Sequence, residues 1–228
     1  MESLFFDFNE YFRPNVLCKL SKNSLDFNNL TIKENRNQCA SILGLDNSNI
    51  AYPIQTHSNK VIDINIAGKY SDVDGLITTN QNIILSIQVA DCVPIFIYDL
   101  ERKCKGLVHS GWRGTADKII SNTIKIFTDN GSNQSDIMVL IGPSIRKCCY
   151  EVGEELLELF DSDCIQSIES KYMLDISCQI KLDLKNIQIP EENIFDSKIC
   201  TYCDSDCHSY RREKGAGRMI AFFGEVNV

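Results

Sequence analysis

The apolar residues of the chain fall into short runs separated by turn residues, which is the pattern of buried β-strands. Two such runs are residues 83–90 (IILSIQVA) and 93–98 (VPIFIY), and a charged turn over 99–103 precedes a third at 104–108. Pro94 predicts an edge strand or a bulge, because proline cannot donate a ladder hydrogen bond. Shorter runs predict further strands at 50–55, 61–66, 137–141 and 219–223.

Other segments have the three- and four-residue spacing of amphipathic helices. One spans about 31–43, where Thr31 and Glu34 have the pattern of a capping box. Another is predicted to open near Thr115, and its buried face would consist of Ala116, Ile119, Ile120, Thr123, Ile124 and Phe127. A short helix is also predicted at 153–160. Strands in direct succession and strand–helix units together predict a mixed α/β fold.

The composition fits an ordinary globular protein. The chain has 228 residues, 43% hydrophobic and 24% charged, which suits a single domain over 1–228. Its net charge of -8 and pI near 4.9 argue against a nucleic-acid or anionic-membrane partner. The N-terminus lacks the basic start of a signal peptide, and no apolar run approaches the roughly 18 residues that span a bilayer. We therefore expect a cytoplasmic protein; the sequence does not indicate its oligomeric state.

Eleven cysteines are expected to be free thiols or metal ligands, because disulfides are rare in the cytosol. Cys18, Cys39 and Cys178 lie among apolar residues, where a free cysteine behaves as a small hydrophobe. The segment Cys200-x2-Cys203-x3-Cys207-His208 has the spacing of a structural zinc knuckle. With the basic residues that follow it, the same segment is also typical of a loop that faces a substrate.

His57, Cys92 and His109 are candidate ligands of one metal ion. The chain has three histidines, and all three candidates lie at predicted strand ends beside small or polar residues. If strands 93–98 and 104–108 form a hairpin, Cys92 lies opposite His109, with α-carbons about 4.5 to 5.5 Å apart. Local spacing cannot place His57. Three protein ligands leave one tetrahedral position open, the arrangement of a catalytic zinc ion.

Other interpretations of these three residues stay open. Each could simply pack in the core. Cys92 could instead be a nucleophile with His109 as its base, in an enzyme that cleaves an amide such as that of a cell-wall precursor. Two histidines and one cysteine also fit a copper site superficially, but a multicopper enzyme needs more than three histidines. A metal-stabilised interaction module is the non-enzymatic alternative.

The glycine-rich segment 110–114 (SGWRG) follows His109 and precedes the helix predicted near Thr115. The free N–H groups and positive dipole end of a helix start attract anions. Arg113 could add a bidentate contact to phosphate. The alternative is that the glycines only permit a tight turn while Trp112 packs.

Several segments together resemble one known family. They are Asn35-Arg36, Gln55-Thr56-His57, Asp74-Gly75-Leu76-Ile77-Thr78, Ala90-Asp91-Cys92-Val93-Pro94, His109-Ser110-Gly111-Trp112-Arg113-Gly114, Ile141-Gly142-Pro143-Ser144-Ile145, Ser209-Tyr210-Arg211-Arg212 and Gly217-Arg218. The family comprises proteins first described as multicopper polyphenol oxidases or laccases. Its members are also described as peptidoglycan editing factors and are now regarded as zinc-dependent purine nucleoside phosphorylases. The matching segments occur in family order from about residue 30 to the C-terminus.

The resemblance implies a single α+β domain with αββα layers of mixed β-sheet. It implies zinc bound by His57, Cys92 and His109, with copper as a weaker alternative. It also implies phosphorolysis of adenosine, inosine and S-methyl-5'-thioadenosine, with adenosine deamination as a side activity. The substrates would thus be purine nucleosides and phosphate, and the residues expected to contact them are Arg36, Gln55, Asp91, Arg113 and Arg211. Asp91 or a water on the metal could transfer the proton.

The chain departs from the family pattern in three places. Cys207-His208 stands where the family usually has bulky apolar residues, which argues against the zinc knuckle. Ser110 replaces a more frequent alanine, a small change beside the metal ligand. The first 30 residues match poorly, so substrate contacts from that segment are not predicted.

Overall fold

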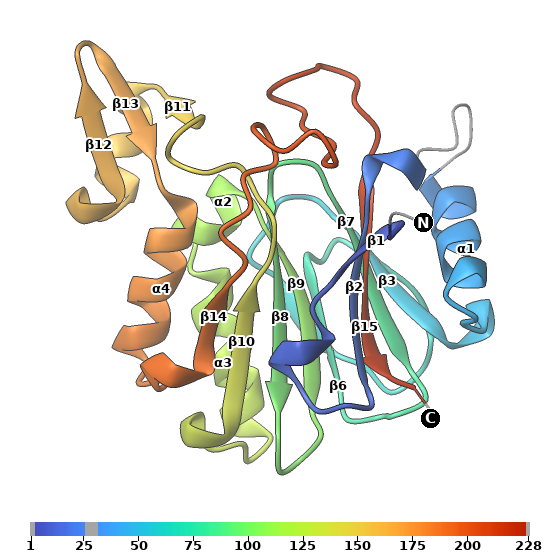
Figure 1. Ribbon diagram of the computed structural model, residues 1–228. Helices are drawn as coiled ribbons and strands as arrows, with labels where there is room; N and C mark the ends of the chain where they lie inside the picture. Colours follow the sequence, from blue (N-terminus) through green and yellow to red (C-terminus); the bar gives the residue numbers. More distant parts are fainter. Residues whose placement is uncertain (1–2, 26–31, 227–228) are drawn as a thin grey trace.

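Two six-stranded sheets pack face to face between two layers of helices (Figure 1). The computed structural model describes residues 3–25 and 32–226. The first sheet contains, in order, β1 (Phe5–Asp7), β2 (Val16–Ser21), β15 (Met219–Glu225), β7 (Ile84–Val89), β3 (Ile50–Ile54) and β5 (Gly68–Ser71). The second contains β14 (Ile194–Asp196), β10 (Ile137–Ile141), β8 (Val93–Asp99), β9 (Lys105–Ser110), β6 (Gly75–Thr78) and β4 (Val61–Asp63).

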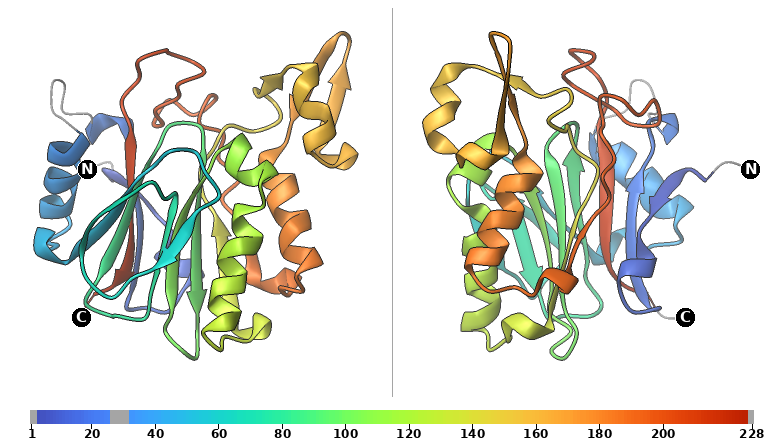
Figure 2. Two further views of the ribbon diagram at one scale, coloured as in Figure 1. Left: turned by 180° about the vertical axis from the view of Figure 1, so that it is seen from behind. Right: turned by 60° about the vertical axis from the view of Figure 1, so that its left-hand side comes forward.

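The helices cover the outer faces of the two sheets. Helix α1 (Ile32–Ile42) lies on the first sheet, while α2 (Trp112–Ala116), α3 (Ile119–Asp129) and α4 (Ile176–Asn186) lie on the second (Figures 1 and 2). A small sheet of β11 (Glu151–Val152), β13 (Lys171–Leu174) and β12 (Ile165–Ile168) projects beyond α4. Short 3-10 turns are η1 (Asn9–Tyr11), η2 (Asn23–Leu25), η3 (Asn47–Asn49), η4 (Gln134–Asp136), η5 (Glu154–Leu159), η6 (Ser162–Cys164) and η7 (Glu191–Asn193). The predicted αββα layering of mixed sheets is confirmed.

Each interface between layers has its own hydrophobic core. Alternate residues of β8 point to opposite faces: Phe96 and Tyr98 pack between the sheets, and Ile95 and Ile97 pack against α3 and α4. On β15, Phe223 likewise faces the second sheet and Phe222 faces α1. Both faces of these strands are buried, which is why their sequences are almost continuously apolar. Burying one such side chain stabilises the fold by about 1.5–3 kcal/mol.

Two predictions about these elements are wrong. Pro94 lies in β8, which is central in its sheet rather than at an edge. Proline has no N–H to donate to the neighbouring Gly142 carbonyl. That carbonyl still has a donor, because it accepts a hydrogen bond from Arg146 at 3.1 Å. The helix predicted to open near Thr115 begins at Trp112 and divides into α2 and α3, because Lys118 has a left-handed backbone (φ 61°). The predicted buried face from Ile119 to Phe127 is confirmed on α3, whereas Thr31 of the predicted capping box lies outside the described residues.

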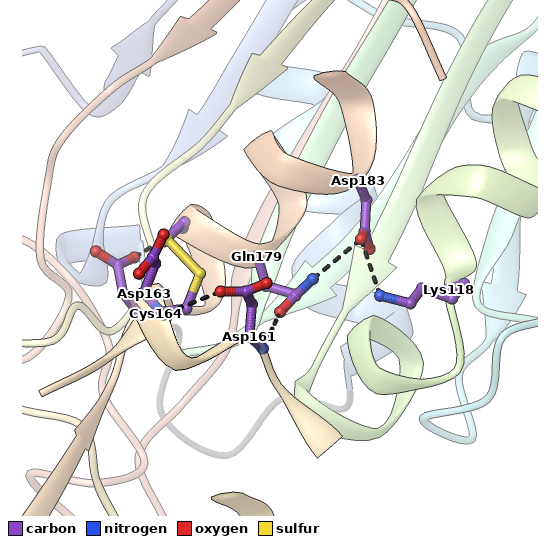
Figure 3. Close-up of a disulfide and its surroundings, with 8 residues drawn as sticks. Lys118, Asp161, Asp163, Cys164, Gln179 and Asp183 are labelled. Atoms are coloured by element: carbon purple, nitrogen blue, oxygen red, sulfur yellow. Dashed lines mark hydrogen bonds and ion pairs between the residues drawn. A yellow bond between two sulfur atoms is a disulfide. The ribbon is translucent and has the colours of Figure 1, made fainter. Parts of the chain in front are cut away.

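Cys178 is not the free thiol that we expected. It forms a disulfide with Cys164 that ties η6 to the first turn of α4 (Figure 3). Beside it, the Gln179 side chain accepts from the Asp161 N–H at 2.8 Å and donates to Asp183 at 3.0 Å. The other nine cysteines are free. Along the described residues, no helix has the length and apolar character needed to cross a bilayer.

Candidate metal centre and pocket

Two loops and the end of one strand bring His57, Cys92 and His109 together at one end of the sheets. His57 follows β3, Cys92 lies between β7 and β8, and His109 is near the end of β9. The ligand atoms of the three side chains all lie within 4.8 Å of one another. The two imidazole rings are 4.8 Å apart, centre to centre, and nearly perpendicular. This grouping is the arrangement that the sequence predicted.

The predicted register of the hairpin, however, is wrong by two residues. In β8 and β9, His109 is opposite Pro94 rather than Cys92. Cys92 directly precedes β8, and its sulfur lies next to Gly111. A Cβ atom on Gly111 would lie 3.0 Å from the Cys92 sulfur and 3.3 Å from the His57 ring. Glycine is therefore needed at this position so that the chain can approach both ligands closely.

Asp74 holds two of the ligands in place, a role that the sequence analysis missed because Asp74-Gly75 has the pattern of a simple turn. Its carboxylate is fully buried and lies 2.8 Å from Nδ1 of His109. It also accepts from the backbone N–H groups of His57 at 3.0 Å and Ser58 at 2.7 Å. His57 has a left-handed backbone (φ 60°), which these hydrogen bonds stabilise. The Asp74 contact orients Nε2 of His109 toward the site, as carboxylates do behind metal-binding histidines.

The charges of the site favour a thiolate. Burial would raise the pKa of the Cys92 thiol, but His109 and His57 outweigh it and lower the pKa to about 6. Burial likewise disfavours the charged form of His109, yet Cys92 and Asp74 raise the pKa of its imidazole to about 9. Burial would also raise the pKa of Asp74, but hydrogen bonds from His109 and Ser58 hold it well below its usual range. A divalent ion requires the thiolate and a neutral imidazole, so its binding would displace the proton that the raised pKa of His109 retains at neutral pH.

The three candidate ligands open into a pocket of about 550 Å³. Its other walls combine arginines, aromatic rings and amides: Gln55, Gln88, Ala90, Asp91, Trp112, Arg113, Ile145, Tyr150, Tyr210, Arg211 and Arg218. Each arginine lies over an aromatic ring, with Arg113 at 4.1 Å from the centre of Trp112 and Arg211 at 5.1 Å from that of Tyr150. The pocket thus offers cationic and aromatic surfaces beside the metal ligands.

The structure places four of the five predicted substrate contacts in the pocket wall. Arg113 and Arg211 present their side chains there. The amide of Gln55 is occupied by the backbone of Gln88, which it contacts at 2.8 and 3.0 Å. Arg36 lies outside the pocket wall, buried beneath a separate hollow, where it stacks on Tyr52 and donates to the Ser86 hydroxyl.

Asp91 lines the pocket but is fully engaged by its neighbours. One carboxylate oxygen accepts from the Thr201 hydroxyl at 2.6 Å, and the other accepts from the Arg211 N–H at 2.7 Å. Its carbonyl accepts from the Ile145 N–H at 2.9 Å. These contacts hold its left-handed backbone (φ 79°) and connect Cys92 to two loops of the pocket.

The sequence analysis did not single out Gln88, Tyr150, Tyr210 or Arg218 as pocket residues. Tyr210 and Arg218 are in matching family segments, so that resemblance was the available signal for them. Gln88 and Tyr150 carry no local motif, since long-range folding alone brings them to the site. Among the described residues, the Gln88 side-chain oxygen is buried without a hydrogen-bond partner.

The predicted zinc knuckle does not form with its expected partners. Cys207 is buried in the core between the sheets, away from any ligand role. Cys200 and Cys203 lie instead beside Cys148 and Cys149. These four thiols form a separate cluster, distinct from the three candidate ligands of the pocket.

The chain is similar in sequence to known proteins. Residues 18–224 match the family described as multi-copper polyphenol oxidoreductase laccase. A purine nucleoside phosphorylase of Clostridium acetobutylicum is 37% identical over 213 residues, covering 89% of this chain and 88% of that protein. The purine nucleoside phosphorylase YlmD of Bacillus subtilis is 32% identical, covering 85% of this chain and 77% of its own length.

Solved structures share the fold over nearly the whole chain. The hypothetical protein YfiH of Bacillus licheniformis superposes with a TM-score of 0.89 at 26% identity, covering 99% of this chain and 98% of that one. YlmD from Geobacillus stearothermophilus has a TM-score of 0.86 at 26% identity and covers 93% of each chain.

Proposed function

The chain belongs to the family described as multi-copper polyphenol oxidoreductase laccase, and on that premise we propose that it is a zinc-dependent purine nucleoside phosphorylase. One observation carries the proposal: a single pocket joins three metal-ligand side chains to arginines and aromatic rings. Curated relatives with 37% and 32% identity are named purine nucleoside phosphorylases. The proposed substrates are adenosine, inosine and S-methyl-5'-thioadenosine, together with phosphate.

The donor set fits zinc. One thiolate and two imidazoles are common zinc ligands, and the ligand atoms of His57, Cys92 and His109 lie close enough together to share one ion. The Asp74 contact fixes the tautomer of His109. A bound zinc ion would supply Lewis-acid polarisation and leave a coordination position for a reactant. Copper is a weaker alternative, because three histidines in the whole chain cannot build several copper centres.

The side chains of the pocket can bind both substrates. Cleavage of the bond between ribose and base gives the sugar oxocarbenium-like character, which a bound phosphate anion stabilises. Arg113, Arg211 and Arg218 supply positive charge for that anion. The rings of Tyr150 and Tyr210 offer surfaces on which a purine can stack.

Two residues receive roles that differ from those expected of direct substrate contacts. Asp91 positions Arg211 by accepting from its backbone N–H, and its other carboxylate oxygen accepts from the Thr201 hydroxyl. Arg36 supports the strand β7 through Ser86 and does not bind phosphate. Gln88 is added to the residues that line the proposed substrate site.

Incubation with inosine, with and without phosphate, tests the reaction. Chromatography should show hypoxanthine and ribose phosphate only when phosphate is present, and chelation followed by zinc addition should abolish and restore turnover. Arg113→Met should raise the phosphate KM about 10- to 100-fold, since it removes charged hydrogen bonds. Arg102→Met, at an exposed arginine outside the pocket, should leave it unchanged. Base release that ignores phosphate would contradict the proposal and indicate a hydrolase.

We also propose adenosine deamination as a side activity of the same pocket. A zinc site with an open position can activate water for attack on a purine carbon. Adenosine in phosphate-free buffer should therefore yield inosine slowly, and Cys92→Ser should abolish this product. Unchanged inosine formation by that variant would assign the activity to a contaminant.

A second candidate is an amide hydrolase that uses a Cys–His pair, with Asp74 as the third member of a triad. It is favoured by the low pKa of Cys92, about 6, and by the contact of Asp74 with His109, the relay geometry of nucleophilic enzymes. Chelation separates the two candidates, because metal removal would spare or increase the activity of a Cys–His enzyme. We propose a cytoplasmic location for either activity, because nine of the eleven cysteines are free, while one pair, Cys164–Cys178, is oxidised.

A further inference from the structure

A second group of metal-ligating side chains lies outside the candidate active site. Cys148 and Cys149 follow β10, and Cys200 and Cys203 lie in the long segment before β15. The four sulfur atoms all lie within 4.8 Å of one another. The sulfur of Cys203 is 3.3 Å from that of Cys149 and 3.9 Å from that of Cys148. These separations exceed the roughly 2.05 Å of a disulfide bond.

The spacing of the sulfurs suits one tetrahedral ion. Zinc binds thiolate at about 2.3 Å, so two sulfurs on one tetrahedral zinc are about 3.8 Å apart. The two separations of the Cys203 sulfur, 3.3 and 3.9 Å, lie close to that value. Cys-x2-Cys is the spacing found in structural zinc sites, and the adjacent pair Cys148-Cys149 supplies the two remaining ligands.

The backbone around the cluster is fixed by hydrogen bonds that do not involve the thiols. Cys200 forms a parallel bridge with Ser144, whose carbonyl accepts from the Thr201 N–H at 3.1 Å. The Cys200 carbonyl accepts from the Asp204 N–H at 2.9 Å, which closes the turn that carries Cys203. On the other loop, the Cys149 N–H donates to the Arg146 carbonyl at 2.8 Å. The fold thus holds the two cysteine pairs against each other before any ion binds.

The surroundings suit a negatively charged thiolate centre. Cys148 and Cys203 are exposed, so solvent can reach the charge and reduce its cost. Lys171 and Arg211 line the hollow next to Cys148 and Cys149. Four thiolates around a divalent ion carry a net charge of about -2, which Arg211 partly offsets. Lys171 is paired with the Glu151 carboxylate at 2.8 Å, so that pair adds little net charge.

We infer that Cys148, Cys149, Cys200 and Cys203 form a second, structural metal site that binds zinc through four thiolates. The ion joins segment 142–150 to segment 200–212. Each segment carries residues of the pocket, including Tyr150 on the first and Arg211 on the second. The role of the ion is to fix these two segments relative to each other. This inference holds whichever reaction the pocket catalyses.

Metal analysis of the protein purified under reducing conditions tests the inference. Wild-type protein should hold one zinc ion more per chain than Cys203→Ser, and also one more than Cys92→Ser, because each variant empties a different site. The double variant should hold none. Equal zinc content in wild type and Cys203→Ser would overturn the inference.

A second measurement needs no variant. Iodoacetamide should label the four cysteines together after zinc removal and spare them together after zinc addition, as read by mass spectrometry of the peptides. The buried Cys207 serves as the internal control, since zinc should not change its labelling. Hydrogen exchange should slow in 142–150 and 200–212 when zinc is restored to Cys92→Ser. Isolation of the four residues as disulfides from reduced preparations, or labelling that ignores zinc, would refute the site.

Discussion

The carboxylate of Asp74 is fully buried and holds two of the three candidate metal ligands in place, His57 and His109. Replacing Asp74 by asparagine changes one of its two oxygens to an NH2 group. In one orientation, the new amide NH2 group would face the N–H groups of Thr56 and Ser58, which now donate at 3.1 and 2.7 Å. In the other orientation, it would face the His57 N–H and Nδ1 of His109, forcing His109 to place a proton on Nε2. Two buried donors without acceptors would cost about 2 to 6 kcal/mol of unfolding free energy.

The same change should weaken metal binding. Loss of a carboxylate behind a metal-binding histidine lowers metal affinity about 10- to 100-fold, which is about 1.4 to 2.8 kcal/mol. The pH dependence should change too. The pKa of Asp74 is held well below its usual range, so its stabilisation is fully present above the unfolded pKa of about 3.9 and is lost as the pH falls below it. The variant should lack this acid-induced loss.

Urea unfolding of metal-free protein and chelator competition for zinc measure the two effects separately. Asp99→Asn is the matched control, because Asp99 is also buried and accepts two backbone N–H bonds. Asp99 is at the end of β8 that is far from the three candidate ligands, about 20 Å from Asp74. Both of these hydrogen bonds end on one oxygen of Asp99, which asparagine retains, so the control should lose less stability than Asp74→Asn and should keep its zinc affinity. If Asp74→Asn bound zinc as tightly as wild type, or if both variants lost affinity equally, the role assigned to Asp74 would be wrong.

Three further predictions concern other parts of the molecule. In metal-free protein, the rate of Cys92 alkylation, measured by peptide mass spectrometry, should fall to half near pH 6, because the pKa of the thiol is lowered to about 6. A midpoint near the ordinary value of about 8.5 would contradict the effect assigned to His57 and His109. Cys178→Ser opens a disulfide between residues 14 apart, so it should lower the unfolding free energy by up to about 3 kcal/mol with kcat unchanged. Reduced wild type should match it in urea unfolding. Arg146→Ala removes one of the two cationic partners of the buried Asp196 carboxylate, 2.8 Å away, and leaves Lys181 as the other. It should cost about 1.5 to 3 kcal/mol, the value of hydrogen bonds to a charged group; a wild-type thermal midpoint would show that the ion pair is dispensable.

The layers of the fold and the grouping of the metal ligands could be predicted from the sequence, but the hairpin register could not. Both faces of β8 and β9 are buried, so no alternation of polar and apolar residues fixes how they align. The turn decides the register instead. Asp99 accepts from the N–H groups of Glu101 and Arg102, and Lys103 has a left-handed backbone (φ 53°). Together they centre the turn between residues 101 and 102, which shifts the pairing by two residues.

Other omissions differ in whether the sequence contained a usable signal. Helix α4 was missed although Asp175 caps it by accepting from the Cys178 N–H, and Ile176, Ile180 and Leu184 recur on its buried face. That spacing was readable. Asp74 was not, because its partners are 16 to 35 residues away in sequence and its own neighbours indicate only a turn. Residues that act through distant contacts need the folded chain to be recognised.

Asp91 shows why the candidate active site and the cysteine cluster belong to one physical unit. It precedes the metal ligand Cys92, and its strained backbone (φ 79°) persists only while neighbours hold it. Those neighbours are Thr201, directly after Cys200, and Arg211, in the same long segment. A movement of segment 200–212 would release Asp91 and so displace the backbone that carries Cys92. The zinc ion proposed for the four surface thiols therefore also stabilises the position of Cys92, through the contacts of the Asp91 carboxylate.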